Sequence, residues 1–349
     1  MLTCTWAPTT FQGTSILTGD APRRQAPTGA ALRALLQGYV QRVEDLSISH
    51  LLIAQRWWGS GREIEGSSLD CLAMTAWFAA RTEKLQLITA VHPGFFEPTV
   101  IAKWGATLAN ISDGRWAINL TSGWNLQEFD MYGVPALTHD QRYERSAEFL
   151  QVLRQAWTGE PLSFQGSYYQ LDGLILEPRP EHPLMVYQGG QSDAALAMAA
   201  DHSDWMFLNG GAPEKIRGLI QRAREAFTAT GRTVRFALYA APLCRATDAE
   251  AWDEIDAMLA RADPELVTAR RTTVSGAQGM WSGDDPLSAL DTNEGYASRL
   301  IGSPETVLQQ IAEFQAMGID MLHLDIRDPL FVEAVLPTVH TLNTLGASH

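Results

Sequence analysis

The segment Leu85–Tyr132 constrains the fold of this 349-residue chain more than any other. Leu85–Val91 and Trp116–Ser122 are nearly continuous apolar runs, and Glu97–Ile111 between them carries apolar residues at helical spacing. The turn-forming pair Asp113–Gly114 precedes the second run. Strands that are apolar on both faces are typical of parallel sheets covered by helices. The segment therefore predicts a buried β-α-β unit.

The same alternation of apolar runs and helical patterns continues along the whole chain. The predicted strands are Leu2–Trp6, Leu51–Gln55, Leu85–Val91, Trp116–Ser122, Leu184–Gln188, Asp204–Asn209, Val234–Leu243 and Met321–Ile326. Eight strands alternating with about eight helices predict an α/β fold, a single (β/α)₈ TIM barrel over residues 1–349. A doubly wound open sheet is the alternative.

Two insertions and one helix start are predicted within this barrel. Ser163–Pro178 has the pattern of a hairpin. Ala262–Gly302, rich in Gly, Ser, Asp and Thr, predicts a mobile lid between the seventh and eighth strands. We expect residues 270–290 to be poorly ordered without ligands and to close over them. Asp140 is the expected N-cap of the helix Asp140–Trp157.

Composition narrows the class of protein. The formal net charge of −14 argues against nucleic acid or an anionic membrane as the main partner. Cys4, Cys71 and Cys244 lack CxxC spacing and predict neither disulfides nor a zinc site. Secretory and membrane-spanning patterns are lacking, since a span needs about 20 apolar residues. We therefore expect a cytoplasmic protein without a membrane partner.

Polar and aromatic side chains directly follow several predicted strands. His92–Phe96 and Thr121–Asn125 follow the third and fourth strands, and Arg56 follows the second. The carboxyl ends of barrel strands meet at one rim, where ligands bind. Aromatic side chains expected at this rim suit a flat conjugated ligand, although each taken alone is better explained by core packing. They are Trp57, Trp58, Phe95, Phe96, Trp104, Trp124 and Trp205.

Gly189–Asp193 opens a helix directly after a strand. Glycine lets backbone approach a ligand closely, and the first N–H groups of a helix attract anions, so the segment suits a phosphate. The alternative is that Ser192 or Asp193 only caps the helix. The chain has no GxGxxG after a strand, no GxxxxGK[ST], no GxSxG, and no HxH or HExxH metal motif. We therefore expect neither a Rossmann dinucleotide site nor a metal.

Five longer motifs narrow the family. They are DGRWAINLTSGWN, HDQRYERSAEFLQVLRQAW, YYQLDGLILEPRP, VYQGGQSDAALAMAADHSDWMF and LIGSPETVLQQIAEFQAMGID. Together they resemble the bacterial luciferase-like superfamily of flavin-dependent monooxygenases, in the branch of the alkanesulfonate, dimethyl sulfone and pyrimidine monooxygenases. The resemblance runs through nearly the whole chain. It implies a TIM barrel that holds reduced FMN at its C-terminal mouth.

The resemblance also assigns residues to the flavin. Asn119 matches the strand-end amide near the flavin ring and the oxygen site, and Tyr143 matches a hydroxyl that reaches the phosphate. The predicted cofactor-binding residues are Asn119, Thr121, Ser122, Tyr143, Gly190, Gln191 and Ser192. Asn119, His92 and Trp124 are the candidate catalytic residues.

Candidate substrate contacts lie at predicted strand ends or in the lid. They are Arg56, Trp57, His92, Trp124, Tyr239, Arg299 and Arg327. Arginine would suit a sulfonate, because guanidinium pairs with tetrahedral oxyanions. The alkanesulfonate branch has an arginine and a histidine where this chain has Tyr239 and Ala241. The resemblance therefore favours a small polar or neutral substrate.

The function that follows is a two-component monooxygenase, using O₂ and FMNH₂ from a separate NAD(P)H:FMN reductase. We expect a small organosulfur substrate, a sulfone or sulfonate, with cleavage of a carbon–sulfur bond. The resemblance implies a homodimer or homotetramer. One alternative is a flavin peroxide that opens or hydroxylates a nitrogen heterocycle or other small ring. Another is a non-catalytic flavin-binding protein.

Overall fold

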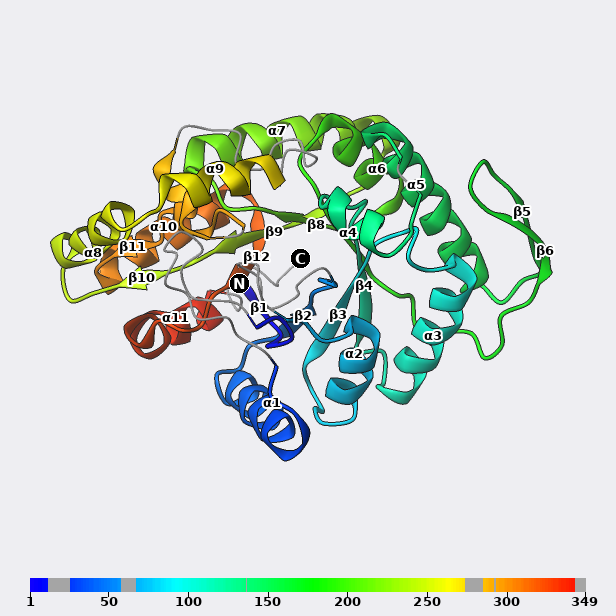
Figure 1. Ribbon diagram of the computed structural model, residues 1–349, viewed down its shortest axis with the longest axis horizontal. Coiled ribbons are helices and arrows are strands. Elements are labelled where there is room, and N and C mark those ends of the chain that lie inside the picture. Colours follow the sequence, from blue (N-terminus) through cyan, green and yellow to red (C-terminus); the bar gives the residue numbers. More distant parts are fainter. Residues whose placement is uncertain (12–25, 58–66, 136, 274–284, 292, 343–349) are drawn as a thin grey trace.

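Eight parallel strands form the centre of the computed structural model, which describes residues 1–11, 26–57, 67–135, 137–273, 285–291 and 293–342. The strands are β1 (Leu2–Trp6), β2 (His50–Ile53), β3 (Gln86–Val91), β4 (Trp116–Leu120), β7 (Val186–Gly189), β8 (Trp205–Leu208), β9 (Arg235–Ala240) and β12 (Ile319–Leu324). They form a closed barrel in the order β1-β12-β9-β8-β7-β4-β3-β2 (Figure 1). Because β1 pairs with both β12 and β2, the ring has no edge. The predicted (β/α)₈ barrel is confirmed, and the open sheet is wrong.

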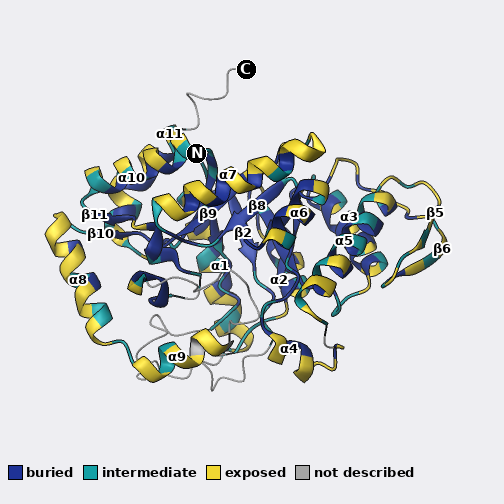
Figure 2. Cartoon of the chain, turned by 90° about the horizontal axis from the view of Figure 1, so that it is seen from above, coloured by how far each residue is buried: buried dark blue, intermediate teal, exposed yellow. Residues whose placement is uncertain are grey.

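Helices surround the barrel, with their buried faces toward the strands (Figure 2). Those that alternate with the strands are α1 (Gly29–Asp45), α2 (Cys71–Ala79), α3 (Pro98–Ile111), α5 (His139–Ala156), α6 (Asp193–His202), α7 (Pro213–Thr230), α10 (Pro304–Met317) and α11 (Leu336–Thr341), the last preceded by the π-helical turn η4 (Phe331–Val335). The expected cap at Asp140 is wrong. Thr138 caps α5 instead, in a capping box with Gln141.

Apolar side chains at alternate strand positions fill the interior of the barrel. They include Leu52, Ile88, Ala117, Phe207, Ala237 and Met321. The other positions of each strand pack against the helices. One such contact is between Trp116 on β4 and Gly105 on α3, where a Cβ on the glycine would lie 2.3 Å from the indole ring. The indole N–H donates to the Thr89 hydroxyl at 2.9 Å, which fixes the ring in place.

Several segments extend beyond the barrel. The predicted hairpin is present as antiparallel β5 (Leu162–Gln165) and β6 (Gln170–Leu174), which project to one side (Figure 1). The short helix α4 (Leu126–Met131), capped by Asn125, follows β4 and was not predicted. The predicted seventh strand is too long, because the chain leaves the barrel after β9 and then forms β10 (Leu243–Cys244), which pairs with β11 (Ile301–Gly302).

The insertion between β9 and β12 is more structured than the predicted lid. It contains α8 (Asp248–Ala260), α9 (Pro264–Thr273) and the 3₁₀ turns η2 (Pro286–Ala289) and η3 (Gly295–Ser298). Residues 285–291 and 293–302 are packed structure, because Leu287, Leu290 and Ile301 are buried in an apolar cluster of their own. Residues 274–284 of the predicted lid lie outside the described residues, and its closure stays a prediction. Within the described part of the chain, we find no helix with the length and apolar character of a membrane span.

The contact between α3 and β4 leads to a stability prediction. We expect Gly105→Ala to lower the free energy of unfolding by about 1–3 kcal/mol, because the added methyl group meets a ring that cannot move. Gly218→Ala is the matched control, since that helical glycine has open space around it, and it should add about 0.5–1 kcal/mol. Urea and thermal unfolding of both variants measure the difference. Equal stability of the two variants would contradict the packing described.

Candidate functional site

A cavity opens at the carboxyl ends of the barrel strands, where the sequence predicts ligand binding. Its empty volume is about 1030 Å³ with the solvent-filled mouth included. Residues from β1, β2, β3, β4, β7, β8, β9 and β12 or from the loops after them line it. The closed barrel therefore brings together side chains that are up to 317 positions apart, from Trp6 to His323.

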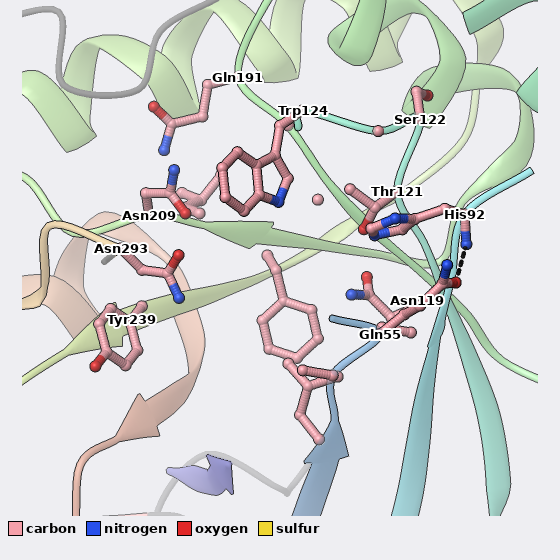
Figure 3. A pocket seen from close by; sticks show the side chains of 18 of the residues that line it. Gln55, His92, Asn119, Thr121, Ser122, Trp124, Gln191, Asn209, Tyr239 and Asn293 are labelled. Carbon is pink, nitrogen blue, oxygen red and sulfur yellow. Dashed lines mark hydrogen bonds between the residues drawn. The ribbon is translucent and has the colours of Figure 1, made fainter. Parts of the chain in front are cut away.

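The end of β4 supplies one polar wall of the cavity. Asn119 lies between Ala90 of β3 and Tyr187 of β7 in the sheet, and Thr121 and Ser122 follow it (Figure 3). Asn119 and Ser122 are buried. The Asn119 Oδ1 and Ser122 Oγ atoms have no hydrogen-bond partner among the described residues. A buried polar atom without a partner is unfavourable, so this wall is suited to a polar ligand.

The turn after β7 is the segment Gly189–Asp193, which the sequence predicts to bind a phosphate and which we call the cradle. Gly190 has φ of 133°, and a Cβ there would lie 2.8 Å from the Tyr143 hydroxyl. Ser192 caps α6 by accepting from the Ala195 N–H at 3.3 Å, and its hydroxyl also hydrogen-bonds with Tyr143. Capping of α6 and binding of a phosphate are therefore compatible roles for this segment, because Ser192 caps the helix and also contacts Tyr143. Burial raises the pKa of Tyr143, so its hydroxyl keeps its proton.

The cradle and the β4 wall belong to one cavity. Tyr143, Gly190 and Gln191 line it together with Asn119 and Thr121, whereas Ser192 is not among the residues that line it. The Gln191 side chain reaches the cavity from the side opposite the β4 wall (Figure 3), and its Nε2 has no partner among the described residues. The arrangement offers an anion site at one end and hydrogen-bonding groups at the other.

His92, at the end of β3, is neutral in the folded protein. Its backbone N–H donates to Gln55 Oε1 at 2.8 Å, and its ring Nδ1 lies 3.9 Å from Glu128 Oε2. Burial and the nearby Arg56 charge lower the pKa of His92 to about 3. At 3.9 Å the two atoms are too far apart for a hydrogen bond, so the buried Glu128 of α4 orients the ring only weakly. With so low a pKa the imidazole stays neutral at neutral pH, so it can take part in hydrogen bonds but is a weak base.

Sequence reasoning missed several cavity residues. His323 points into the barrel from β12, its Nε2 has no partner among the described residues, and burial lowers its pKa to about 3. Gln55 and Asn209 are each the last residue of a predicted strand, so this position could have identified them as cavity residues. Asn293 also lines the cavity, and no local pattern marks it, because it reaches the cavity only through the fold of the insertion.

Four of the candidate substrate contacts line the cavity. They are Arg56, His92, Trp124 and Tyr239. The Arg56 guanidinium lies 5.4 Å from the centre of the Trp124 ring, close enough for a cation–π contact.

The other three candidates do not line the cavity, which corrects their expected positions. The ring of Trp57 packs at 5.3–5.5 Å against Phe95, Phe96 and Tyr132. Arg299 is directed to Asp285, with Nη2 3.2 Å from Oδ2. Arg327 is held by Asp325, with Nε 2.8 Å from Oδ1. All three side chains have partners of their own, in an aromatic cluster or in ion pairs.

Most of the aromatic rim predicted from sequence is core packing instead. Of that set, only Trp124 lines the cavity among the described residues. Trp104 packs edge-on against Trp116 at 5.5 Å, outside the barrel. Trp205 begins β8, so it lies at the opposite end of the strand, beneath the Arg235 guanidinium at 4.2 Å. Trp58 lies outside the described residues.

The cavity lining fits a flavin mononucleotide. Its polar groups are chiefly carboxamides and hydroxyls, and none of the described residues that line it is an aspartate or glutamate. Gly190, Tyr143 and Ser192 suit a phosphate, because glycine leaves room and a helix begins there. The unpaired atoms of Asn119 and Ser122 suit the polar edge of a ring system, and the unpaired Nε2 of Gln191 faces the cavity from the opposite side.

Comparison with known proteins agrees with this site. The sequence profile of the family described as luciferase-like monooxygenase matches residues 12–321. An FMNH(2)-dependent dimethylsulfone monooxygenase of Pseudomonas putida is 36% identical over 278 residues, which cover 75% of this chain and 76% of that protein. A protein of the same name from Pseudomonas fluorescens (strain Pf0-1) is 33% identical over 302 residues, 83% of this chain and 82% of that protein.

Solved structures share the fold. EDTA monooxygenase from Chelativorans sp. BNC1 superposes with a TM-score of 0.77 at 21% identity, covering 98% of this chain and 94% of that chain. DmoA from Hyphomicrobium sulfonivorans superposes with a TM-score of 0.74 at 19% identity, and the match covers 98% of this chain and 88% of that chain.

The buried histidines lead to a pH prediction. Burial lowers the pKa of His50 to about 4 and of His92 and His323 to about 3, whereas an unfolded histidine titrates near 6.5. As pH falls below 6.5 the unfolded chain binds protons that the folded chain does not, so the free energy of unfolding falls. Asp291, whose pKa burial raises to about 6, opposes this trend only in part, because it is one group against three.

We expect His323→Gln to lose less stability than the parent protein between pH 7 and pH 5. Its unfolded state lacks one of the groups that take up a proton. His182→Gln, at an exposed histidine, is the control and should keep the parent slope. Urea unfolding at several pH values measures the slopes, and the same slope in His323→Gln as in the parent would refute a neutral His323.

Proposed function

Since the chain belongs to the luciferase-like monooxygenase family, we propose that it uses reduced FMN and O₂ to oxidise a small organosulfur compound, a sulfone or sulfonate, with cleavage of a carbon–sulfur bond. The observation that carries the proposal is the cavity, in which a phosphate cradle and unpaired polar groups line one space at the carboxyl ends of the strands. The relatives named as dimethylsulfone monooxygenases support the substrate class.

At the phosphate end, Tyr143 and Ser192 would donate hydroxyl hydrogen bonds to the FMN phosphate. The backbone N–H groups at the start of α6 would add to them, and the positive end of the helix favours an anion. Gly190 keeps this space open, because a side chain there would meet the Tyr143 hydroxyl. Charge-assisted hydrogen bonds of this kind are about twice as strong as neutral ones.

At the ring end, Asn119 would hold the flavin through its unpaired Oδ1, which can accept from a ring N–H. Bound reduced FMN supplies the two electrons with which O₂ is activated. Asn119, Ser122 and Gln191 are already held by the strand ends and loops, so they would orient the ring without large rearrangement. The buried walls exclude water from the reacting centre.

His92 is a candidate catalytic residue that could hydrogen-bond to the substrate. It is buried and neutral, and it lines the same cavity as Asn119 and Trp124. Trp124 would cover the substrate with its ring, and Arg56 lies over the other side of that ring. Oxygen insertion at the carbon beside sulfur would consume one oxygen atom of O₂, and the other leaves as water. The hydroxylated product would then break into an aldehyde and a sulfinate or sulfite.

The proposal includes a partner and an assembly state. Reduced FMN is to come from a separate NAD(P)H:FMN reductase, in keeping with relatives named as FMNH(2)-dependent. A homodimer or homotetramer and a cytoplasmic location remain predictions from the resemblance of the sequence.

The cradle leads to a binding prediction. We expect Tyr143→Phe to weaken FMN binding about ten- to a hundredfold, because one hydrogen bond to an anion contributes roughly 1.5–3 kcal/mol. Tyr168→Phe is the matched control, since its hydroxyl donates to Glu144 at 3.0 Å outside the cavity, and it should bind FMN as the parent does. Quenching of FMN fluorescence during titration gives both affinities. Unchanged affinity in Tyr143→Phe would remove the tyrosine from the phosphate site.

The activity itself is tested with purified protein, FMN, a flavin reductase, NADH and oxygen. We expect release of sulfinate from sulfones or sulfite from sulfonates, with ¹⁸O from labelled O₂ in the product. A panel that gives no sulfur product would refute the organosulfur substrate and leave FMN binding intact. Ring-opened products from nitrogen heterocycles in the same assay would favour the alternative substrate class.

A further inference from the structure

The insertion between β9 and β12 contributes one side chain to the cavity among the described residues. That side chain is Asn293. It lies beside Asn209, from the end of β8, and across the cavity from His92 and Asn119 (Figure 3). Gln191 and Tyr239 belong to the same wall (Figure 3). The wall opposite the β4 end therefore presents three carboxamides in a row.

The turn that carries Asn293 is held from both sides. The carboxylate of Asp291 accepts from the backbone N–H groups of Asn293 at 2.8 Å, Gly295 at 2.9 Å and Tyr296 at 3.2 Å. The Asn293 carbonyl accepts from the Gly210 N–H at 2.9 Å. With both of its backbone groups engaged, Asn293 has little freedom beyond its side-chain rotamer. A side chain on such a support is presented to the cavity at low entropic cost.

The turn is also docked closely on the barrel. A Cβ on Gly210 would lie 1.8 Å from the Glu294 carbonyl oxygen, so the two backbones are in direct contact. Ser298 donates its hydroxyl to the Tyr239 carbonyl at 2.8 Å. These contacts fix the position of Asn293 relative to Asn209 at the end of β8 and Tyr239 on β9.

Among the described residues, the insertion contributes no charged side chain to the cavity lining, although it contains arginines. Arg299 of the insertion is paired with Asp285, and Arg327 after β12 is paired with Asp325, both away from the cavity. No hydrogen bond joins the carboxamides of Asn209 and Asn293 to other described residues. Both groups are neutral and able to donate, so they suit a ligand with neutral acceptor oxygens.

We propose that Asn293, together with Asn209, determines specificity by holding the oxygens of a neutral sulfone and disfavouring a sulfonate anion. The inference rests on the proposed organosulfur function and narrows it. Dimethyl sulfone and methanesulfonate have nearly the same shape, with one methyl group replaced by a charged oxygen. An anion brought into a water-poor cavity needs a cation to compensate its lost hydration, and a carboxamide supplies only a hydrogen bond.

The arginines that line the cavity, Arg56 and Arg142, are the competing determinants. Arg142 directly precedes Tyr143 of the phosphate end, and the Arg56 guanidinium lies over Trp124. If Arg56 selected the ligand, methanesulfonate would bind more tightly than dimethyl sulfone, and Arg56→Met would remove that preference. If Asn209 and Asn293 select the ligand, dimethyl sulfone binds more tightly than methanesulfonate, and Arg56→Met leaves that order unchanged.

The test is equilibrium binding to the full chain loaded with oxidised FMN, measured by ligand-observed NMR with dimethyl sulfone and with methanesulfonate. We expect the parent protein to bind the sulfone at least tenfold more tightly. Asn293→Leu, which has a similar volume without the hydrogen bond, should weaken sulfone binding about five- to tenfold. Asn293→Arg should reverse the preference toward methanesulfonate. FMN affinity and the thermal midpoint should stay at parent values in both variants.

Asn110→Leu, at a surface asparagine bonded to the Arg179 carbonyl and remote from the cavity, controls for the substitution itself. Equal or tighter binding of methanesulfonate by the parent protein, or an unchanged ratio in Asn293→Leu, overturns the role of Asn293 while turnover of either compound still supports the proposed function. If neither compound binds and neither is turned over, both the proposed function and this inference fail.

Discussion

The pairing of β1 with β12 is the constraint on which the rest of this molecule depends. Leu2 to Thr5 lie in register with Met321 to Leu324, while the other edge of β1 pairs with β2. This closure brings the carboxyl ends of all eight strands to one rim. Without it, Trp6 and His323, whose rings are 4.4 Å apart in the barrel, would lie at opposite ends of a sheet. Every wall of the cavity is therefore a consequence of closure.

Desolvation governs the chemistry inside that cavity. The chain carries a net charge of −14, yet the described residues lining the cavity include no carboxylate, and its buried histidines are neutral. Two acidic groups bind backbone N–H groups: Glu128 accepts from the backbone N–H of Trp57, and Asp291 accepts from three backbone N–H groups. Negative charge is thus kept on the surface and in supporting turns. The interior remains suited to an anionic cofactor and a polar substrate.

The insertion between β9 and β12 shows how a loop becomes part of a rigid wall. Its composition is that of a mobile segment, but residues 285–291 and 293–302 bury apolar side chains. They also hydrogen-bond to the barrel, through the Asn293 carbonyl to the Gly210 N–H after β8 and through the Ser298 hydroxyl to the Tyr239 carbonyl of β9. Close backbone contact at Gly210 takes the place of side-chain packing. Among the described residues, the insertion contributes only Asn293 to the cavity lining.

The sequence by itself determined the barrel, the order of its elements and the two polar clusters at Asn119 and Gly190, because apolar periodicity and turn residues are local properties of the chain. It did not reveal α4 with Glu128, the helix cap at Thr138 or the position of Asn293. It also misplaced Arg299 and Arg327, which a strand-end or loop position cannot distinguish from true cavity residues. Only the tertiary structure decided which polar side chains face the cavity and which are satisfied elsewhere, because an ion pair or a backbone contact between residues distant in sequence leaves no local pattern.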